Sequence, residues 1–175
     1  MSDPLYRVRQ LLRAANAQPL TEQEIKRVET VLTPDALALY QTMPLGDQRH
    51  SLVIFDALRE QGYNDRPLLQ AALLHDVAKR NIGLAHRTGV VMLNKWSSDA
   101  LARWASSEPH SWRYPFYVSL HHPELGAELA AHTGVEPEAL ELIREHQAAV
   151  PNFAGTNKAT LEKWHHALKA LDDVN

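Results

Sequence analysis

The chain has 175 residues, a formal net charge of -3 with neutral histidines, and no cysteine. This length fits one domain, and the lack of cysteine excludes disulfides, zinc–thiolate sites and iron–sulfur clusters. The small net charge favours neither nucleic-acid nor membrane binding, and no apolar run approaches the ~18 residues that a membrane-spanning helix needs. Because the polar N-terminus has no signal-peptide pattern, we expect a cytoplasmic protein.

The first part of the chain predicts short helices. Apolar residues recur there at helical spacing, at Leu5, Val8, Leu11 and Leu12. Thr21, with a glutamate three residues later, has the form of a capping box, and Thr33 followed by Pro34 is typical of a cap with proline in the first turn. We expect residues 1–45 to form an N-terminal helical extension that packs on a domain formed by residues 46–175.

The next two helices carry the most informative residues of the sequence. Hydrophobic periodicity predicts a helix over 47–62, which ends at a glycine. Asp65 is a candidate N-cap for the following helix, which we expect to end at 81–83. This second helix carries His75 and Asp76 in its predicted last turn.

The remainder of the chain also predicts helices and only weak strand signals. Two short helices are expected around 90–93 and 100–104. Pro123 and Pro137 are each expected to begin a helix, and a loop over 149–156 separates these from a final helix. The predicted fold class is therefore all-α, arranged as a helical bundle.

A histidine and an aspartate stand side by side after an apolar run, at His75 and Asp76. Burying two ionisable groups is costly unless something binds them, and a divalent metal binds both types. Further candidate ligands are His50, His122, His146 and Asp172. Ligands on antiparallel helices meet in the core of a bundle, and imidazole with carboxylate suits several divalent metals. We expect one or two divalent ions, of Mn, Fe, Co, Ni, Mg or Zn.

The order of these residues resembles the HD-domain superfamily of metal-dependent phosphohydrolases. The matching segments are 48–51, 71–79, 122–126, 143–146 and 168–173. The resemblance implies that a first metal is held by His50, His75, Asp76 and Asp172. It implies that a second metal is held by Asp76, His122 and His146. Asp173, next to Asp172, stays an alternative ligand, and the Gly-Tyr-Pro signature of the family's cyclic-di-GMP phosphodiesterases is missing.

The chemistry of this set and the resemblance together predict a phosphohydrolase that cleaves a phosphoester or phosphoanhydride of a small molecule with metal-activated water. The resemblance implies that the substrate is a nucleotide. Asp76 bridges the metals and Lys79 offsets charge on the phosphoryl oxygens. Lys79 is equally well explained as a cation in a last helical turn. The candidate phosphate contacts are Arg49, Lys79, Arg80, His86 and Arg87.

Two other functions remain open at this stage. One is a nucleotide-binding sensor domain with little or no activity, and the other is a di-iron oxygenase. The sequence also leaves open whether the chain forms a homo-oligomer. It indicates no membrane partner and no specific nucleic-acid partner.

Overall fold

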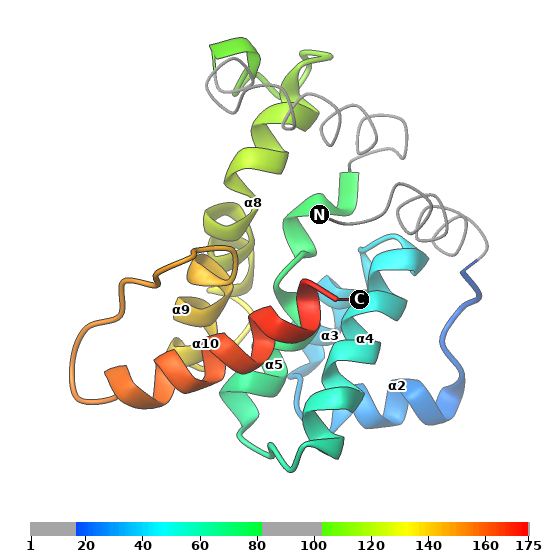
Figure 1. Ribbon diagram of the computed structural model, residues 1–175. Helices are drawn as coiled ribbons and strands as arrows, with labels where there is room; N and C mark the ends of the chain where they lie inside the picture. Colours follow the sequence, from blue (N-terminus) through cyan, green and yellow to red (C-terminus); the bar gives the residue numbers. More distant parts are fainter. Residues whose placement is uncertain (1–16, 82–102, 175) are drawn as a thin grey trace.

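The computed structural model describes residues 17–81 and 103–174, and these ranges contain helices and no strand (Figure 1). The α-helices are α2 (Glu22–Glu29), α3 (Pro34–Gln41), α4 (Leu45–Glu60), α5 (Arg66–Leu74), α8 (Tyr114–Ala130), α9 (Pro137–Glu145) and α10 (Lys158–Asp172). A 3-10 helix, η1 (Val77–Asn81), follows α5. The predicted all-α fold class is confirmed. No helix in the described ranges has the length and apolar character needed to cross a membrane.

The N-terminal helices begin where the sequence predicts. The Thr21 hydroxyl accepts a hydrogen bond from the Glu24 amide, and the Glu24 carboxylate accepts one from the Thr21 amide at 2.7 Å, which completes the capping box. The Thr33 hydroxyl caps α3 by accepting a hydrogen bond from the Ala36 amide, and Pro34 stands in the first turn of this helix. The helical pattern predicted before Pro19 lies mostly within residues 1–16, outside the described residues.

One hydrophobic cluster joins the N-terminal helices to the rest of the bundle. Val28 of α2, Tyr40 of α3, Leu58 of α4 and Leu68 of α5 are all buried in it. Residues of α9 and α10 belong to the same cluster. Helices α2 and α3 thus share the core of the bundle, whereas the division of the chain at residue 45 stays a prediction.

Buried polar contacts tie the same regions together. The Gln70 side chain donates to the Val31 carbonyl and accepts from the Glu136 amide, both at 2.9 Å. The Thr33 hydroxyl donates to the carbonyl of Thr133. Buried polar groups are normally hydrogen-bonded. Here their bonds link the connection between α2 and α3 to α5 and to the segment that begins α9.

The second predicted helix is shorter than its sequence pattern indicates. α5 ends at Leu74, and His75 is its C-cap rather than a residue of its last turn. The chain then tightens into η1, whose Lys79 amide donates to the Asp76 carbonyl. The prediction of one helix up to 81–83 is therefore wrong, and Asp76 lies at the junction of the two helices.

The prediction that Pro123 begins a helix is also wrong. α8 runs without a break through Pro123. Proline has no amide, so the carbonyl of Ser119 loses its helical donor. The His122 ring compensates, because its Nδ1 lies 3.0 Å from that oxygen.

The remaining predicted boundaries are largely confirmed. α9 begins at Pro137, and the loop over 149–156 separates it from α10. The helix expected around 90–93 lies outside the described residues, and only the last two positions of the one around 100–104 are described, both helical. Figure 1 shows α10 lying across α4, α5 and α9, which brings the C-terminal end of the chain to the middle of the bundle.

Candidate metal centre

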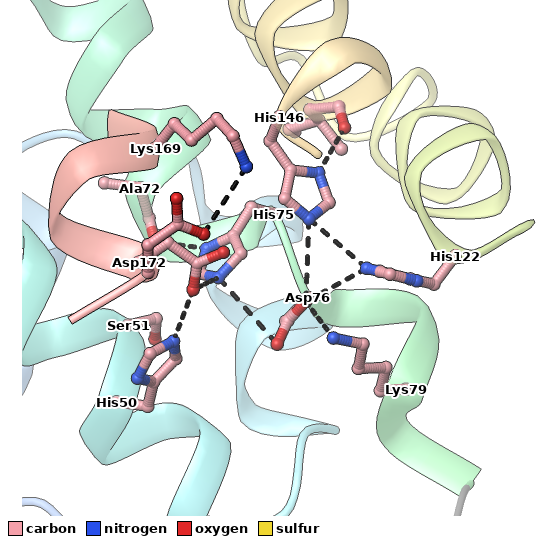
Figure 2. A network of polar contacts seen from close by, with 12 residues as sticks. His50, Ser51, Ala72, His75, Asp76, Lys79, His122, His146, Lys169 and Asp172 are labelled. Atoms are coloured by element: carbon pink, nitrogen blue, oxygen red, sulfur yellow. Dashed lines mark hydrogen bonds and ion pairs between the residues drawn. The ribbon is translucent and has the colours of Figure 1, made fainter. Parts of the chain in front are cut away.

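Five helices bring the six residues predicted as metal ligands to one place (Figure 2). They are His50 of α4, His75 and Asp76 at the end of α5, His122 of α8, His146 at the end of α9, and Asp172 at the end of α10. Their side chains form two groups that meet at Asp76, one on each side of its carboxylate.

The first group consists of His50, His75, Asp172 and the Oδ2 atom of Asp76. Oδ1 of Asp172 lies 2.9 Å from His50 Nε2 and 3.4 Å from His75 Nε2. His75 Nε2 lies 3.8 Å from Asp76 Oδ2. The His50 and Asp172 side chains are 23% and 21% exposed, so this group opens to solvent.

The neighbouring aspartates of α10 separate clearly. Asp172 points into the first group, whereas Asp173 is 60% exposed and pairs with Lys169 at 3.4 Å. Of the two alternatives that the sequence left open, the structure places Asp172 beside the other candidate ligands.

The second group consists of His122, His146 and the Oδ1 atom of Asp76. This oxygen lies 3.4 Å from His122 Nε2 and 3.8 Å from His146 Nε2. The two Nε2 atoms are 3.2 Å apart. Both imidazole side chains are only 1% exposed, so this group is enclosed by the protein.

The three buried histidines among the candidate ligands are oriented in the same way. In each ring Nδ1 lies close to the carbonyl oxygen three residues earlier, at 3.0 Å for His75 and Ala72, 3.0 Å for His122 and Ser119, and 2.7 Å for His146 and Ile143. A carbonyl only accepts, so Nδ1 carries the proton and donates. In the neutral ring Nε2 then holds the lone pair, as a metal ligand requires.

The geometry of the helices makes these carbonyls available. Ala72 and Ile143 lie in the last turns of α5 and α9, whose carbonyls lack an amide donor within the helix. The Ser119 carbonyl is freed by Pro123. Each histidine thus satisfies a backbone group and directs Nε2 toward the shared centre.

Gly126 allows α8 to approach the centre closely. A methyl group at this position would lie 3.3 Å from the Ile143 side chain and 3.6 Å from the carbonyl oxygen of His75. The first of these distances is tighter than an ordinary contact. The lack of a side chain therefore lets the helix that carries His122 lie against the ends of α5 and α9.

Electrostatics differ between the two groups. Burial alone would lower the pKa of His75, but the carboxylates of Asp76 and Asp172 outweigh it and raise the pKa to about 9. Burial would raise the pKa of Asp172, yet the His50 and His75 rings beside it hold that pKa well below its usual range. In the second group burial lowers the pKa of His146 to about 3, and burial together with Lys79 lowers that of His122.

Both groups fit a divalent cation. In each, three nitrogen and oxygen ligand atoms lie within 4.8 Å of one another. His75 Nε2 is fully buried and makes no hydrogen bond to any residue that the structure describes. Ring nitrogens and carboxylate oxygens that point at one another inside the protein are unsatisfied acceptors, and this is costly unless a cation or a proton lies between them. Imidazole and carboxylate ligands without thiolate suit Mn, Fe, Co, Ni or Zn.

Lys79 lies directly beside the ligands. Its Nζ is 2.7 Å from Asp76 Oδ1, the oxygen of the second group. Burial would raise the pKa of Asp76, but the Lys79 charge, together with the neighbouring histidines, outweighs it and holds that pKa well below its usual range. Lys79 thus carries a positive charge at the centre and is more than a cation at a helix end.

Of the other candidate phosphate contacts, the structure describes Arg49 and Arg80. The Arg49 guanidinium donates to the carbonyls of Gln18 and Pro19 and pairs with Glu24 at 2.5 Å, so it anchors the N-terminal segment. Its role as a phosphate contact stays a prediction, which these bonds oppose. Arg80 lines a pocket of about 320 Å³ between η1 and α8. His86 and Arg87 lie outside the described residues.

One residue near the centre is absent from the predicted site. His165 of α10 is fully buried, and its Nε2 lies 2.9 Å from the carbonyl oxygen of Glu145, the residue before His146. It therefore fixes the end of α9 at the point where a candidate ligand is attached. The sequence shows His165 beside His166 without indicating which of them turns inward.

No family model, curated protein or solved structure matches this chain. The structure itself shows an all-α protein with a buried cluster of histidine and aspartate side chains that could hold a metal ion. Its resemblance to HD domains depends on the motif residues themselves.

Proposed function

We propose that this protein is a metal-dependent phosphohydrolase that cleaves a phosphoester or phosphoanhydride bond of a nucleotide. The observation that carries the proposal is the position of Asp76. Its Oδ2 faces the first group and its Oδ1 faces the second, so one carboxylate is shared between two sets of ligands. Two divalent ions, when bound, supply an activated water and clamp the attacking and leaving oxygens of phosphoryl transfer.

The residues of the chain divide this work. His50, His75, Asp172 and Asp76 would hold one ion; His122, His146 and Asp76 would hold the other. The partly exposed side chains of the first group leave a path for the phosphate of the substrate. Lys79 brings positive charge to the phosphoryl oxygens as negative charge develops on them.

The test is hydrolysis by purified protein loaded with Mn²⁺, measured as the nucleotide and phosphate products formed from a panel of nucleoside phosphates and dinucleoside polyphosphates. We expect turnover in the wild type and a loss of about a hundredfold or more in His75→Ala, since removal of a ligand removes an ion that activates water. Asp172→Ala and Asp173→Ala form a matched pair, because the two aspartates are adjacent and only the first points into the centre. Asp173→Ala is expected to keep its activity.

Two outcomes would contradict the proposal. If the protein binds Mn²⁺ and hydrolyses none of these compounds, the sensor alternative is favoured. If Asp173→Ala loses as much activity as Asp172→Ala, the assigned ligand set is wrong.

The cytoplasmic location expected from the sequence agrees with a nucleotide substrate.

A further inference from the structure

The ammonium group of Lys79 contacts the carboxylate oxygen that a second cation would use. Its Nζ lies 2.7 Å from Asp76 Oδ1, and the same oxygen is the carboxylate atom nearest to His122 Nε2. Among the residues that the structure describes, this oxygen supplies the carboxylate ligand of the second group, whose other two ligands are imidazoles. A metal ion and a lysine ammonium on this oxygen would repel each other at short range.

The first group differs in this respect. It contains Asp172 in addition to the Oδ2 atom of Asp76, so two carboxylates contribute to it. In the second group two neutral imidazoles accompany an oxygen whose charge Lys79 already compensates. The first group therefore attracts a divalent ion more strongly than the second.

We propose that Lys79 competes with the second metal ion for Asp76, so that the two ions bind in sequence and the second displaces the Lys79 ammonium. The inference rests on the proposed function, because it concerns how the metal centre of that function is filled. Once displaced, the ammonium is available to the phosphoryl oxygens of the substrate. Lys79 thus couples completion of the metal centre to recognition of the phosphate.

Calorimetric titration of the chelator-treated protein with Mn²⁺ tests the competition without measuring activity. We expect two steps in the wild type. In Lys79→Met the second step should tighten about tenfold, which corresponds to about 1.4 kcal/mol, while the first step changes by less than about threefold. Lys79→Gln should behave like Lys79→Met, and Lys79→Arg, which keeps the charge, should not tighten the second step.

Binding of inorganic phosphate to the Mn²⁺-saturated protein tests the second half of the proposal. Lys79→Met should bind phosphate about tenfold or more weakly, because a charge-assisted hydrogen bond is lost. The opposite signs are diagnostic, since metal binding improves while phosphate binding worsens. A lysine that only contacts phosphate would weaken phosphate binding and leave the metal steps unchanged, which would overturn the competition.

Two controls locate the effect. Lys169→Met removes a nearby cation that pairs with Asp173 instead of Asp76, and it should leave the second step unchanged. In a His146→Ala background, which lacks a ligand of the second group, Lys79→Met should no longer tighten any step. Tightening by Lys169→Met as large as that by Lys79→Met would show a general charge effect and overturn the proposal.

The outcomes also separate this inference from the proposed function. If the wild type binds no Mn²⁺, the proposed metal centre itself fails. If two ions bind with the same affinities in the wild type and in Lys79→Met, the competition fails while the metal centre stands. If the wild type binds one ion and Lys79→Met binds two, the competition is supported in its strongest form.

Discussion

The two halves of the centre use the same side-chain types and reach opposite electrostatic states. In the first group the carboxylates around His75 outweigh burial and raise its pKa to about 9. In the second group burial and the charge of His75 lower the pKa of His146 to about 3. The ligand types alone therefore do not determine the state of a site, because the balance between burial, carboxylates and neighbouring cations decides it.

The comparison assigns different tasks to the two halves. The partly exposed first group has excess acceptor charge and attracts a cation or a proton. The enclosed second group holds neutral imidazoles, and its oxygen is compensated by Lys79. Asp76 belongs to both groups, so its replacement should weaken metal binding in both of them.

The largest expected effect is that of Asp76→Asn. Since its carboxylate serves both groups, this variant should lose both ions, with Mn²⁺ affinity reduced about a hundredfold or more at each step. His50→Ala should weaken mainly the first ion, and His146→Ala only the second. The measurement is metal content per chain after dialysis against Mn²⁺, with Asp173→Asn as the control of unchanged content. Equal loss of both ions in His146→Ala would show that the halves are not separable.

The pH dependence of stability in the metal-free protein should reveal the opposite pKa shifts. The raised pKa of His75 contributes stability that is complete below its unfolded value of 6.5 and is lost as the pH rises toward about 9. The lowered pKa of His146 contributes stability that is lost as the pH falls from 6.5 toward about 3. Each proton changes the free energy of unfolding by up to about 1.4 kcal/mol per pH unit.

We therefore expect a maximum of stability near pH 6.5 in chelator-treated protein, measured by urea denaturation between pH 4 and 9. In His75→Gln the decline on the alkaline side should disappear, and in His146→Gln the decline on the acid side should become shallower. Stability that rises from pH 6.5 to 9 in the wild type would contradict the raised pKa of His75.

The smallest expected effect concerns His165, which acts on the second group only through the backbone. His165→Leu removes the hydrogen bond to the Glu145 carbonyl and should weaken the second Mn²⁺ step about tenfold, with little change in the first. His165→Gln can keep a donor at the position of Nε2 and should restore most of the affinity. Equal damage by both variants would indicate that packing, not the hydrogen bond, sets the position of His146.

Local sequence patterns predicted most of the helices because their causes are local. The caps at Thr21 and Thr33 depend on bonds to amides three residues away, and both form. The predictions failed at Asp76 and at Pro123, where α5 ends early and α8 continues. At each place a histidine ring lies beside a carbonyl that lacks a helical donor, and helical periodicity does not reveal such a contact.

The sequence by itself determined an all-α chain, because helix periodicity is a pattern of residues close together in the chain. It also determined a short set of histidines and aspartates that can hold metal, because this chemistry belongs to each side chain. Only the tertiary structure decided that Asp172 and not Asp173 turns inward, that Arg49 anchors the N-terminal segment, and that Lys79 lies on Asp76. These outcomes depend on how each helix is rotated against its neighbours. That rotation is set by the packing of the whole core, which no single segment specifies.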